Sequence, residues 1–142
     1  EKIKKIRDNW KGKLVIKGVE SIHDVEKACN IGLDGIIVSN HGGRQVDVGQ
    51  ATIDSMNSII PKYKNKIKIM MDSGIRGGAD VARVMSCGAD FCFLGRTFMY
   101  GVSALGKKGG THTITMLIKQ LTQIMEQFSC GEISNFQDKI IK

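Results

Sequence analysis

A histidine and an arginine lie three positions apart in the loop SNHGGR, residues 39–44. Among side chains, histidine is the type best suited to moving protons near neutral pH, so His41 is a candidate for proton transfer. Arg44 carries a planar guanidinium that can bind both oxygens of a carboxylate. The structural alternative is a loop histidine beside a solvated arginine, although Gly42 and Gly43 leave the loop little side-chain packing of its own. The loop is a candidate for proton transfer beside a bound carboxylate, and the structural alternative stays open.

Two glycine-rich segments further along the chain each carry an arginine. DSGIRGG, residues 72–78, contains Arg76, and GRTFMYG, residues 95–101, contains Arg96. Glycine lets backbone N–H groups approach a ligand closely, and the helices expected beyond both segments add the positive ends of their dipoles. The pair of turns therefore favours a phosphate site. The alternative is that the glycines only allow tight turns and that both arginines are solvated.

Lys17 directly follows the short apolar run at residues 14–16. Its ammonium group either extends from an apolar surface into water or points into a site, and position alone does not decide between the two. Asp72 has the same ambiguity. His23 and His112 lie on or near helix surfaces without supporting residues, so we interpret both as structural.

The candidate residues follow short apolar segments that have the composition of buried strands. Segments with apolar residues at three- and four-residue spacing separate them and predict helices. Strands are expected at residues 14–16, 35–38, 67–71 and 91–94, and helices at about residues 1–13, 21–32, 53–61, 81–85 and 111–129. Four strand-then-helix units in succession predict an α/β fold with a parallel sheet and right-handed crossovers. The candidate loops then follow the carboxyl ends of strands, where such folds place their ligands.

Length and composition limit the possible classes of protein. The 142 residues fit a single domain over 1–142, but are fewer than the ~250 of a closed eight-unit barrel. The chain contains 42% hydrophobic and 25% charged residues, and this composition excludes a disordered protein and a protein embedded in a membrane. Four scattered cysteines predict reduced packing residues and no metal site. Without a membrane-spanning run or a signal segment, we expect a cytoplasmic protein.

A net charge of +7 raises the alternative of a non-catalytic module that binds nucleic acid. Only 6% of the residues are aromatic, and no stacking platform is visible. We therefore expect no nucleic-acid partner.

Four motifs together resemble a known family: LVIKG, GIIVSNHGGRQVD, DSGIRGGADV and GADFCFLGRTFMYG. In this order and spacing they are similar to the carboxyl-terminal half of the FMN-dependent α-hydroxy-acid oxidoreductases, which include glycolate oxidase, lactate oxidase and cytochrome-linked lactate dehydrogenase. The likeness extends from about Trp10 to Ser129. It implies units 5–8 of a (β/α)8 TIM barrel and a flavoprotein that oxidises a lactate-like L-2-hydroxy acid to the 2-keto acid.

The resemblance also implies roles for individual residues. His41 would be the catalytic base, and Arg44 would bind the substrate carboxylate. Lys17 would lie against the N1 and C2 carbonyl edge of the flavin, and Ser39 near the flavin ring. The residues that match the phosphate-holding motifs are Asp72, Gly74, Arg76, Gly95 and Arg96.

The sequence departs from the family pattern at three positions. Gly77 stands where many relatives carry a second arginine, and Thr97 and Gln50 each replace a frequent proline. None of these departures removes a side chain to which the family assigns catalysis.

The resemblance covers only half of a barrel, which leaves two sheet edges to be covered. The chain is then expected to be a fragment, one half of a split enzyme, or a half-barrel that self-associates, and alone it is expected to be incomplete for turnover.

The electron acceptor stays open between oxygen, a quinone and a cytochrome, and through this acceptor the protein could bind peripherally to a membrane. Residues 130–142 are expected to form a flexible tail. Open alternatives are another FMN-binding or phosphate-binding barrel enzyme and a non-catalytic fragment.

Overall fold

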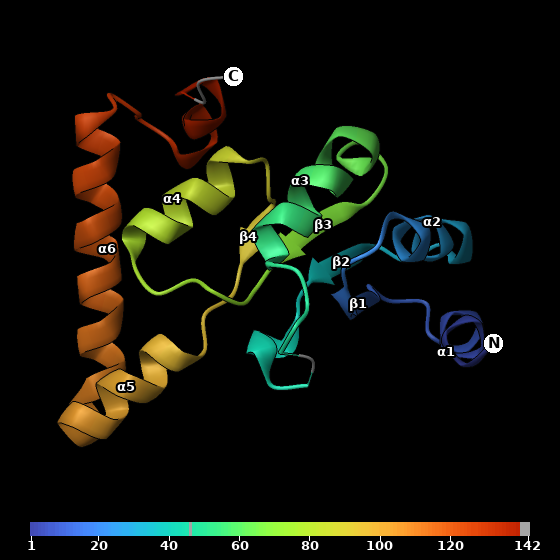
Figure 1. Ribbon diagram of the computed structural model, residues 1–142, viewed down its shortest axis with the longest axis horizontal. Helices are drawn as coiled ribbons and strands as arrows, with labels where there is room; N and C mark the ends of the chain where they lie inside the picture. Colours follow the sequence, from blue (N-terminus) through green and yellow to red (C-terminus); the bar gives the residue numbers. More distant parts are fainter. Residues whose placement is uncertain (46, 140–142) are drawn as a thin grey trace.

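The computed structural model describes residues 1–45 and 47–139. Its central feature is a parallel sheet of four strands in the order β1-β2-β3-β4 (Figure 1). The strands are β1 (Val15–Val19), β2 (Gly35–Val38), β3 (Lys68–Met71) and β4 (Phe91–Cys92). The helices are α1 (Lys2–Asn9), α2 (Ile22–Ile31), α3 (Thr52–Tyr63), α4 (Gly78–Ser86), α5 (Arg96–Leu105) and α6 (Gly109–Gln127), and the 3-10 helices are η1 (His41–Gly43), η2 (Gly106–Lys108) and η3 (Ile133–Lys139).

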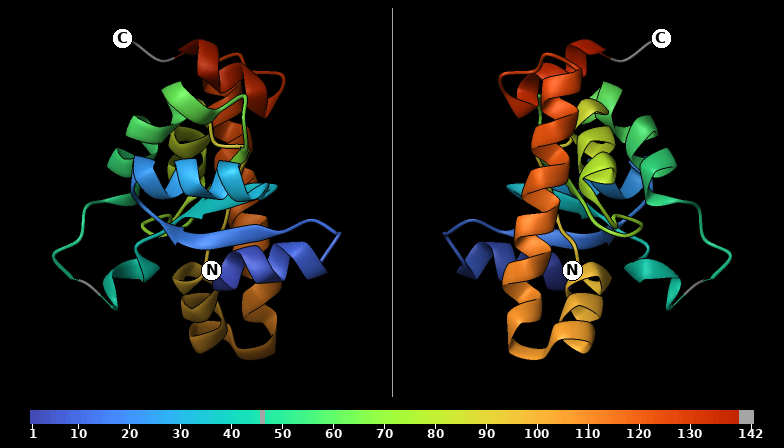
Figure 2. Two further views of the ribbon diagram at one scale, coloured as in Figure 1. Left: turned by 90° about the vertical axis from the view of Figure 1, so that its right-hand side faces the viewer. Right: turned by 90° about the vertical axis from the view of Figure 1, so that its left-hand side faces the viewer.

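Each strand pairs in parallel with the next strand along the chain, and a helix follows each one. This order confirms the predicted α/β fold of four consecutive units. A closed barrel needs its first and last strands to pair, whereas β1 and β4 form the two edges of the described sheet. The described sheet is therefore open, in agreement with the partial (β/α)8 barrel that the resemblance implies. Figure 2 shows the long helix α6 running beside α4 and α5, against both of which it packs.

The main hydrophobic core lies between one face of the sheet and its helices. Ile36 of β2 and Ile69 of β3 are register partners, and both are fully buried. Val25 of α2 and Met56 and Ile59 of α3 are fully buried in the same core. Burial of this apolar row fixes the register, because a slip by one residue would turn the row to the opposite face.

A second row of register partners lies on the other face of the sheet, because side chains alternate along a strand. It contains Lys17, Ile37, Met70 and Phe91, one residue from each strand. This face corresponds to the interior of a closed barrel. The Phe91 side chain is 56% exposed here.

Local sequence signals account for the ends of α2. The Ser21 hydroxyl accepts a hydrogen bond from the Asp24 amide at 3.1 Å, which satisfies one free donor of the first turn. Gly32 ends the helix in a left-handed conformation with φ +79°. Both ends agree with the predicted helix at residues 21–32. Helix α3 runs past Pro61 to Tyr63, two residues beyond its predicted end.

Two features differ from the sequence-based expectation. Lys17 lies within β1 and not after it, because the strand continues to Val19 through an irregularity at Gly18. The segment predicted as a turn at residues 95–101 is the start of helix α5. The flexible tail expected at residues 130–142 stays a prediction; part of it forms η3, in which Phe136 is buried and packs with Ala82 of α4. Residues 140–142 of that tail lie outside the described residues.

All four cysteines are free, in agreement with their predicted role in packing. Burial raises the pKa of the Cys29, Cys87 and Cys92 thiols, which keeps them protonated and poorly nucleophilic. In the part of the chain that the structure describes, no helix has the length and apolar character needed to cross a membrane.

Candidate functional site

A cavity of about 380 Å³ lies at the carboxyl ends of the strands. Strand β1 and the connections after β2, β3 and β4 all contribute to its walls. The polar side chains that line it are Lys17, His41, Arg44, Asp72, Ser73, Arg76 and Arg96, and the remaining lining residues are Gly42, Ile75, Phe93, Leu94, Gly95 and Met99. Four of its seven polar side chains are lysine or arginine, so the cavity suits an anionic ligand.

A hydrogen-bonded network holds Lys17 at the cavity wall. Its ammonium group lies 2.7 Å from Asp72 Oδ2 and donates to the Ser39 hydroxyl at 2.6 Å. Burial would raise the pKa of the Asp72 carboxyl, but hydrogen bonds from Lys17, Ser39 and Ser73 and the charge of Lys17 outweigh it and lower this pKa. Asp72 is therefore ionised at neutral pH, and its charge fixes the ammonium group of Lys17 in place.

His41 adopts a left-handed backbone conformation with φ +56° at the start of η1. Its amide donates to the Ser39 hydroxyl at 3.2 Å, and its carbonyl accepts from Arg44 Nε at 3.2 Å. The imidazole lies against Gly18, where a Cβ atom would be 2.7 Å from His41 Cε1. Within residues 1–45 and 47–139 the imidazole has no hydrogen-bond partner, so both ring nitrogens are available to a ligand.

The two predicted arginine-bearing turns meet in the cavity. Arg76 Nη1 donates to the Ile75 carbonyl at 2.9 Å, and the Arg96 guanidinium donates to the Gly42 carbonyl. Arg96 is also the first residue of α5, so the positive end of that helix dipole faces the same region. No atom lies within 4 Å of a Cβ built on Gly95, which leaves the backbone there open to a ligand.

Seven of the nine predicted site residues line the cavity, and the other two lie beside it. Ser39 is only 1% exposed and reaches the site through its hydrogen bond with Lys17. Gly74, with φ +80°, lines an adjoining cavity. His23 and His112 are exposed on α2 and α6, outside the cavity, as their structural interpretation implies.

Sequence reasoning missed two polar groups of the site. Ser73 accepts from the Gly42 amide at 3.0 Å and donates to Asp72 Oδ1 at 2.9 Å, so it connects the turn after β3 to the His41 loop. Thr97 donates to the Arg76 carbonyl at 3.2 Å and connects the start of α5, which carries Arg96, to the turn that carries Arg76. The available signal was a small polar residue within each motif, but both contacts depend on how separate segments pack together.

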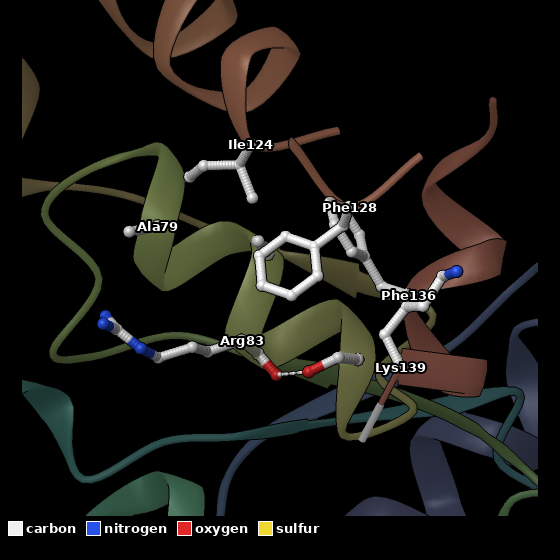
Figure 3. Close-up of a pocket in the computed structure, with 8 residues that line it drawn as sticks. Ala79, Arg83, Ile124, Phe128, Phe136 and Lys139 are labelled. Carbon is white, nitrogen blue, oxygen red and sulfur yellow. Dashed lines mark hydrogen bonds between the residues drawn. The ribbon is translucent and has the colours of Figure 1, made fainter. Parts of the chain in front are cut away.

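A third cavity lies outside the sheet, between α4, α6 and η3 (Figure 3). Ile124, Phe128 and Phe136 give it an apolar lining, with Arg83 and Lys139 at its edge. It contains none of the predicted site residues. The chemistry indicated by the sequence therefore belongs to the cavity at the strand ends.

The profile of the family described as FMN-dependent dehydrogenase matches residues 1–142, the full chain. The chain belongs to this family. Membership confirms the resemblance carried by the four motifs, and it fits a cavity in which cations and a histidine gather at the strand ends.

Relatives in the FMN-dependent dehydrogenase family include bacterial L-lactate dehydrogenases. The chain is 40% identical to that of Alcaligenes faecalis over 136 residues, which cover 96% of this chain and 36% of the relative. It is 42% identical to that of Actinobacillus pleuropneumoniae serotype 5b over 130 residues, which cover 92% of this chain and 34% of the relative. The chain thus spans about a third of the length of these family members.

Solved structures of similar proteins share the fold. A soluble mutant of the membrane-associated (S)-mandelate dehydrogenase from Pseudomonas putida is 32% identical, with a TM-score of 0.88 over 94% of this chain and 38% of that one. A mandelate oxidase is 28% identical, with a TM-score of 0.90 over 96% of this chain and 41% of that one. These values agree with a family fold of which the chain forms a part.

Proposed function

We propose that the chain carries the proton-transfer, carboxylate-binding and phosphate-binding groups of an enzyme that oxidises a lactate-like L-2-hydroxy acid to the 2-keto acid with FMN. The observation that supports this most directly is the single cavity that contains His41, Arg44, Arg76 and Arg96. An enzyme that needed only the phosphate site would have no use for a histidine and a carboxylate-binding arginine beside it.

The residues of the cavity fit FMN. The phosphate group would lie between Arg76 and Arg96 at the first turn of α5, where the open backbone of Gly95 allows a close approach. Lys17 would lie near the N1 and C2 carbonyl edge of the flavin. Its contact with Asp72 at 2.7 Å keeps the ammonium group at the cavity wall.

Two residues would act on the substrate. Arg44 would bind the carboxylate through its guanidinium and orient the α-carbon. His41 would accept a proton, from the hydroxyl if the α-hydrogen leaves as hydride, or from the α-carbon if a carbanion forms. FMN, when bound, would supply the acceptor for the two electrons that the hydroxy acid loses. Lys17 would place a fixed positive charge where negative charge develops.

Flavin binding and reduction by the chain test this proposal. The purified chain is incubated with FMN, separated from free flavin and mixed with L-lactate in the absence of oxygen, while the flavin absorbance is followed. Retained flavin is the expected result, with bleaching by lactate that is slow because the chain alone is expected to be incomplete for turnover. A chain that retains no FMN would contradict the cofactor assignment, and retention without bleaching would contradict the reaction for this chain.

A pair of histidine variants separates catalysis from folding. His41→Gln should retain FMN and slow bleaching by roughly 100-fold or more, the usual contribution of a general base. His23→Gln, on the exposed surface of α2, is the matched control and should behave like the unmodified chain. Equal rates in the two variants would contradict the role of His41 as base.

A further inference from the structure

Thr97 connects two parts of the site that are distant in sequence. It is the second residue of α5, and its side chain is buried, with only 7% of the residue exposed. The hydroxyl lies 3.2 Å from the Arg76 carbonyl and 3.5 Å from the Ile75 carbonyl. Both carbonyls belong to the turn after β3, whereas Thr97 follows β4. A single hydroxyl therefore joins the turn that carries Arg76 to the first turn of α5, which carries Arg96.

The backbone of Arg76 is fixed from both sides. Its amide donates to Asp80 Oδ2 at 2.9 Å, and its carbonyl accepts from Thr97 at 3.2 Å. The guanidinium of Arg76 in turn donates to the Ile75 carbonyl at 2.9 Å, the second carbonyl near the Thr97 hydroxyl. A shift of these carbonyls would carry the guanidinium with it. The position of the Arg76 charge thus depends on the Thr97 contact.

Arg96, which precedes Thr97, bears the other charge. Because Thr97 is held against the Arg76 peptide, the first turn of α5 and the turn after β3 keep a fixed separation. The distance between the two arginines that the proposed function assigns to the phosphate is therefore limited by the hydrogen bond of Thr97 with the Arg76 carbonyl.

We propose that Thr97 is a positioning residue for the phosphate group of FMN, acting through Arg76 and Arg96 without touching the flavin. The proposal rests on the proposed function, because it assumes that the cavity binds FMN. Removal of the Thr97 hydroxyl should weaken the binding of FMN but not of riboflavin, which lacks the phosphate. A general loss of protein stability would weaken the binding of both flavins.

The test compares the dissociation constants of FMN and riboflavin, measured by quenching of flavin fluorescence, for Thr97→Val and Thr97→Ser. Valine keeps the volume and removes the hydroxyl, so the affinity for FMN should fall about five- to tenfold, the effect of one hydrogen bond. The affinity for riboflavin should stay within about twofold, and serine should restore FMN binding. Thr113→Val is the matched control, because Thr113 is also a buried threonine but packs against Gly101, away from Arg76.

Several results would overturn the proposal. An equal loss of FMN and riboflavin affinity in Thr97→Val would show a merely structural role, and unchanged FMN affinity would show no role. If Thr97→Val fails to fold, the comparison of Thr97→Ala with Thr97→Ser isolates the same hydroxyl. An unmodified chain that binds neither flavin would overturn the proposed function together with this inference, whereas normal FMN binding with no effect of Thr97 would overturn the inference alone.

Discussion

Gly18 and His41 face each other at the cavity, and both have backbone conformations that L-residues seldom adopt. Gly18 has φ +90° and His41 has φ +56°. Glycine at position 18 leaves room for the imidazole, since a Cβ atom there would lie 2.7 Å from Cε1 of the ring. The backbone of a residue in β1 thus determines where the proposed base can lie.

Replacement of Gly18 by alanine should displace the His41 side chain. Gly18→Ala and the control Gly32→Ala both place alanine at a positive φ. This strain should lower the free energy of unfolding of each variant by about 1–2 kcal/mol. No atom lies within 4 Å of a Cβ at Gly32, so only Gly18→Ala also pushes against the imidazole. Urea unfolding measures the common loss, and NMR of the His41 ring measures the displacement. Unchanged ring signals in Gly18→Ala would contradict the contact.

At the scale of elements, local patterns predicted all four strands, because each is an apolar run between polar turns. Lys17 was predicted after a strand because Gly18 interrupts the apolar pattern, and only pairing of Val19 with Val38 shows that β1 continues. Helix α5 was predicted as a turn because glycines flank it. It is stabilised by tertiary contact with α6, where the Gly101 and Gly109 backbones meet, and no local pattern carries that information.

The site was predictable to the extent that its residues lie within motifs. His41, Arg44 and the two motif arginines follow strands, and parallel strands bring their carboxyl ends together. The contact of Thr97 with Arg76 depends instead on how closely two separate turns approach, a distance that α6 helps to set. Such distances follow from packing and have no signature in sequence spacing.

The close packing of α4 on α6 depends on a glycine. A Cβ atom on Gly78 would lie 2.6 Å from both Gln120 Cβ and the Leu121 amide nitrogen of α6. The Gly78 amide also donates to Gln120 Oε1 at 2.8 Å, so α6 satisfies a free donor at the start of α4. The two helices must therefore separate if any side chain is added at this position.

Gly78→Ala should destabilise the protein by about 1–3 kcal/mol, the usual cost of an overpacked contact. Gly110→Ala is the matched control, because Gly110 is also helical and no atom lies within 4 Å of its Cβ position. Alanine there should be neutral or stabilise by roughly 0.5–1 kcal/mol, since it restricts the unfolded chain. Urea unfolding compares the two variants, and equal effects would contradict a tight helix contact at Gly78.

At the scale of the whole molecule, the described sheet has two unpaired edges and an uncovered face. Phe91 of the edge strand β4 is 56% exposed, and Phe93, two residues on, is 41% exposed. Their rings pack with centroids 5.0 Å apart. Two exposed phenylalanines beside the unpaired backbone N–H and C=O groups of β4 favour association with the edge of another sheet. The same face carries Lys17, so whatever covers it also borders the site.

The isolated chain is accordingly expected to self-associate as its concentration rises, and Phe91→Lys should reduce this association. Lysine places a charge at the exposed edge, where pairing with a second sheet would bury it. Val48→Lys is the control, because Val48 is 95% exposed in the loop after η1 and lies in none of the sheet edges. Sedimentation velocity over a range of concentrations measures the effect. A chain that stays monomeric throughout, or equal association of the two variants, would show that the β4 edge does not drive assembly.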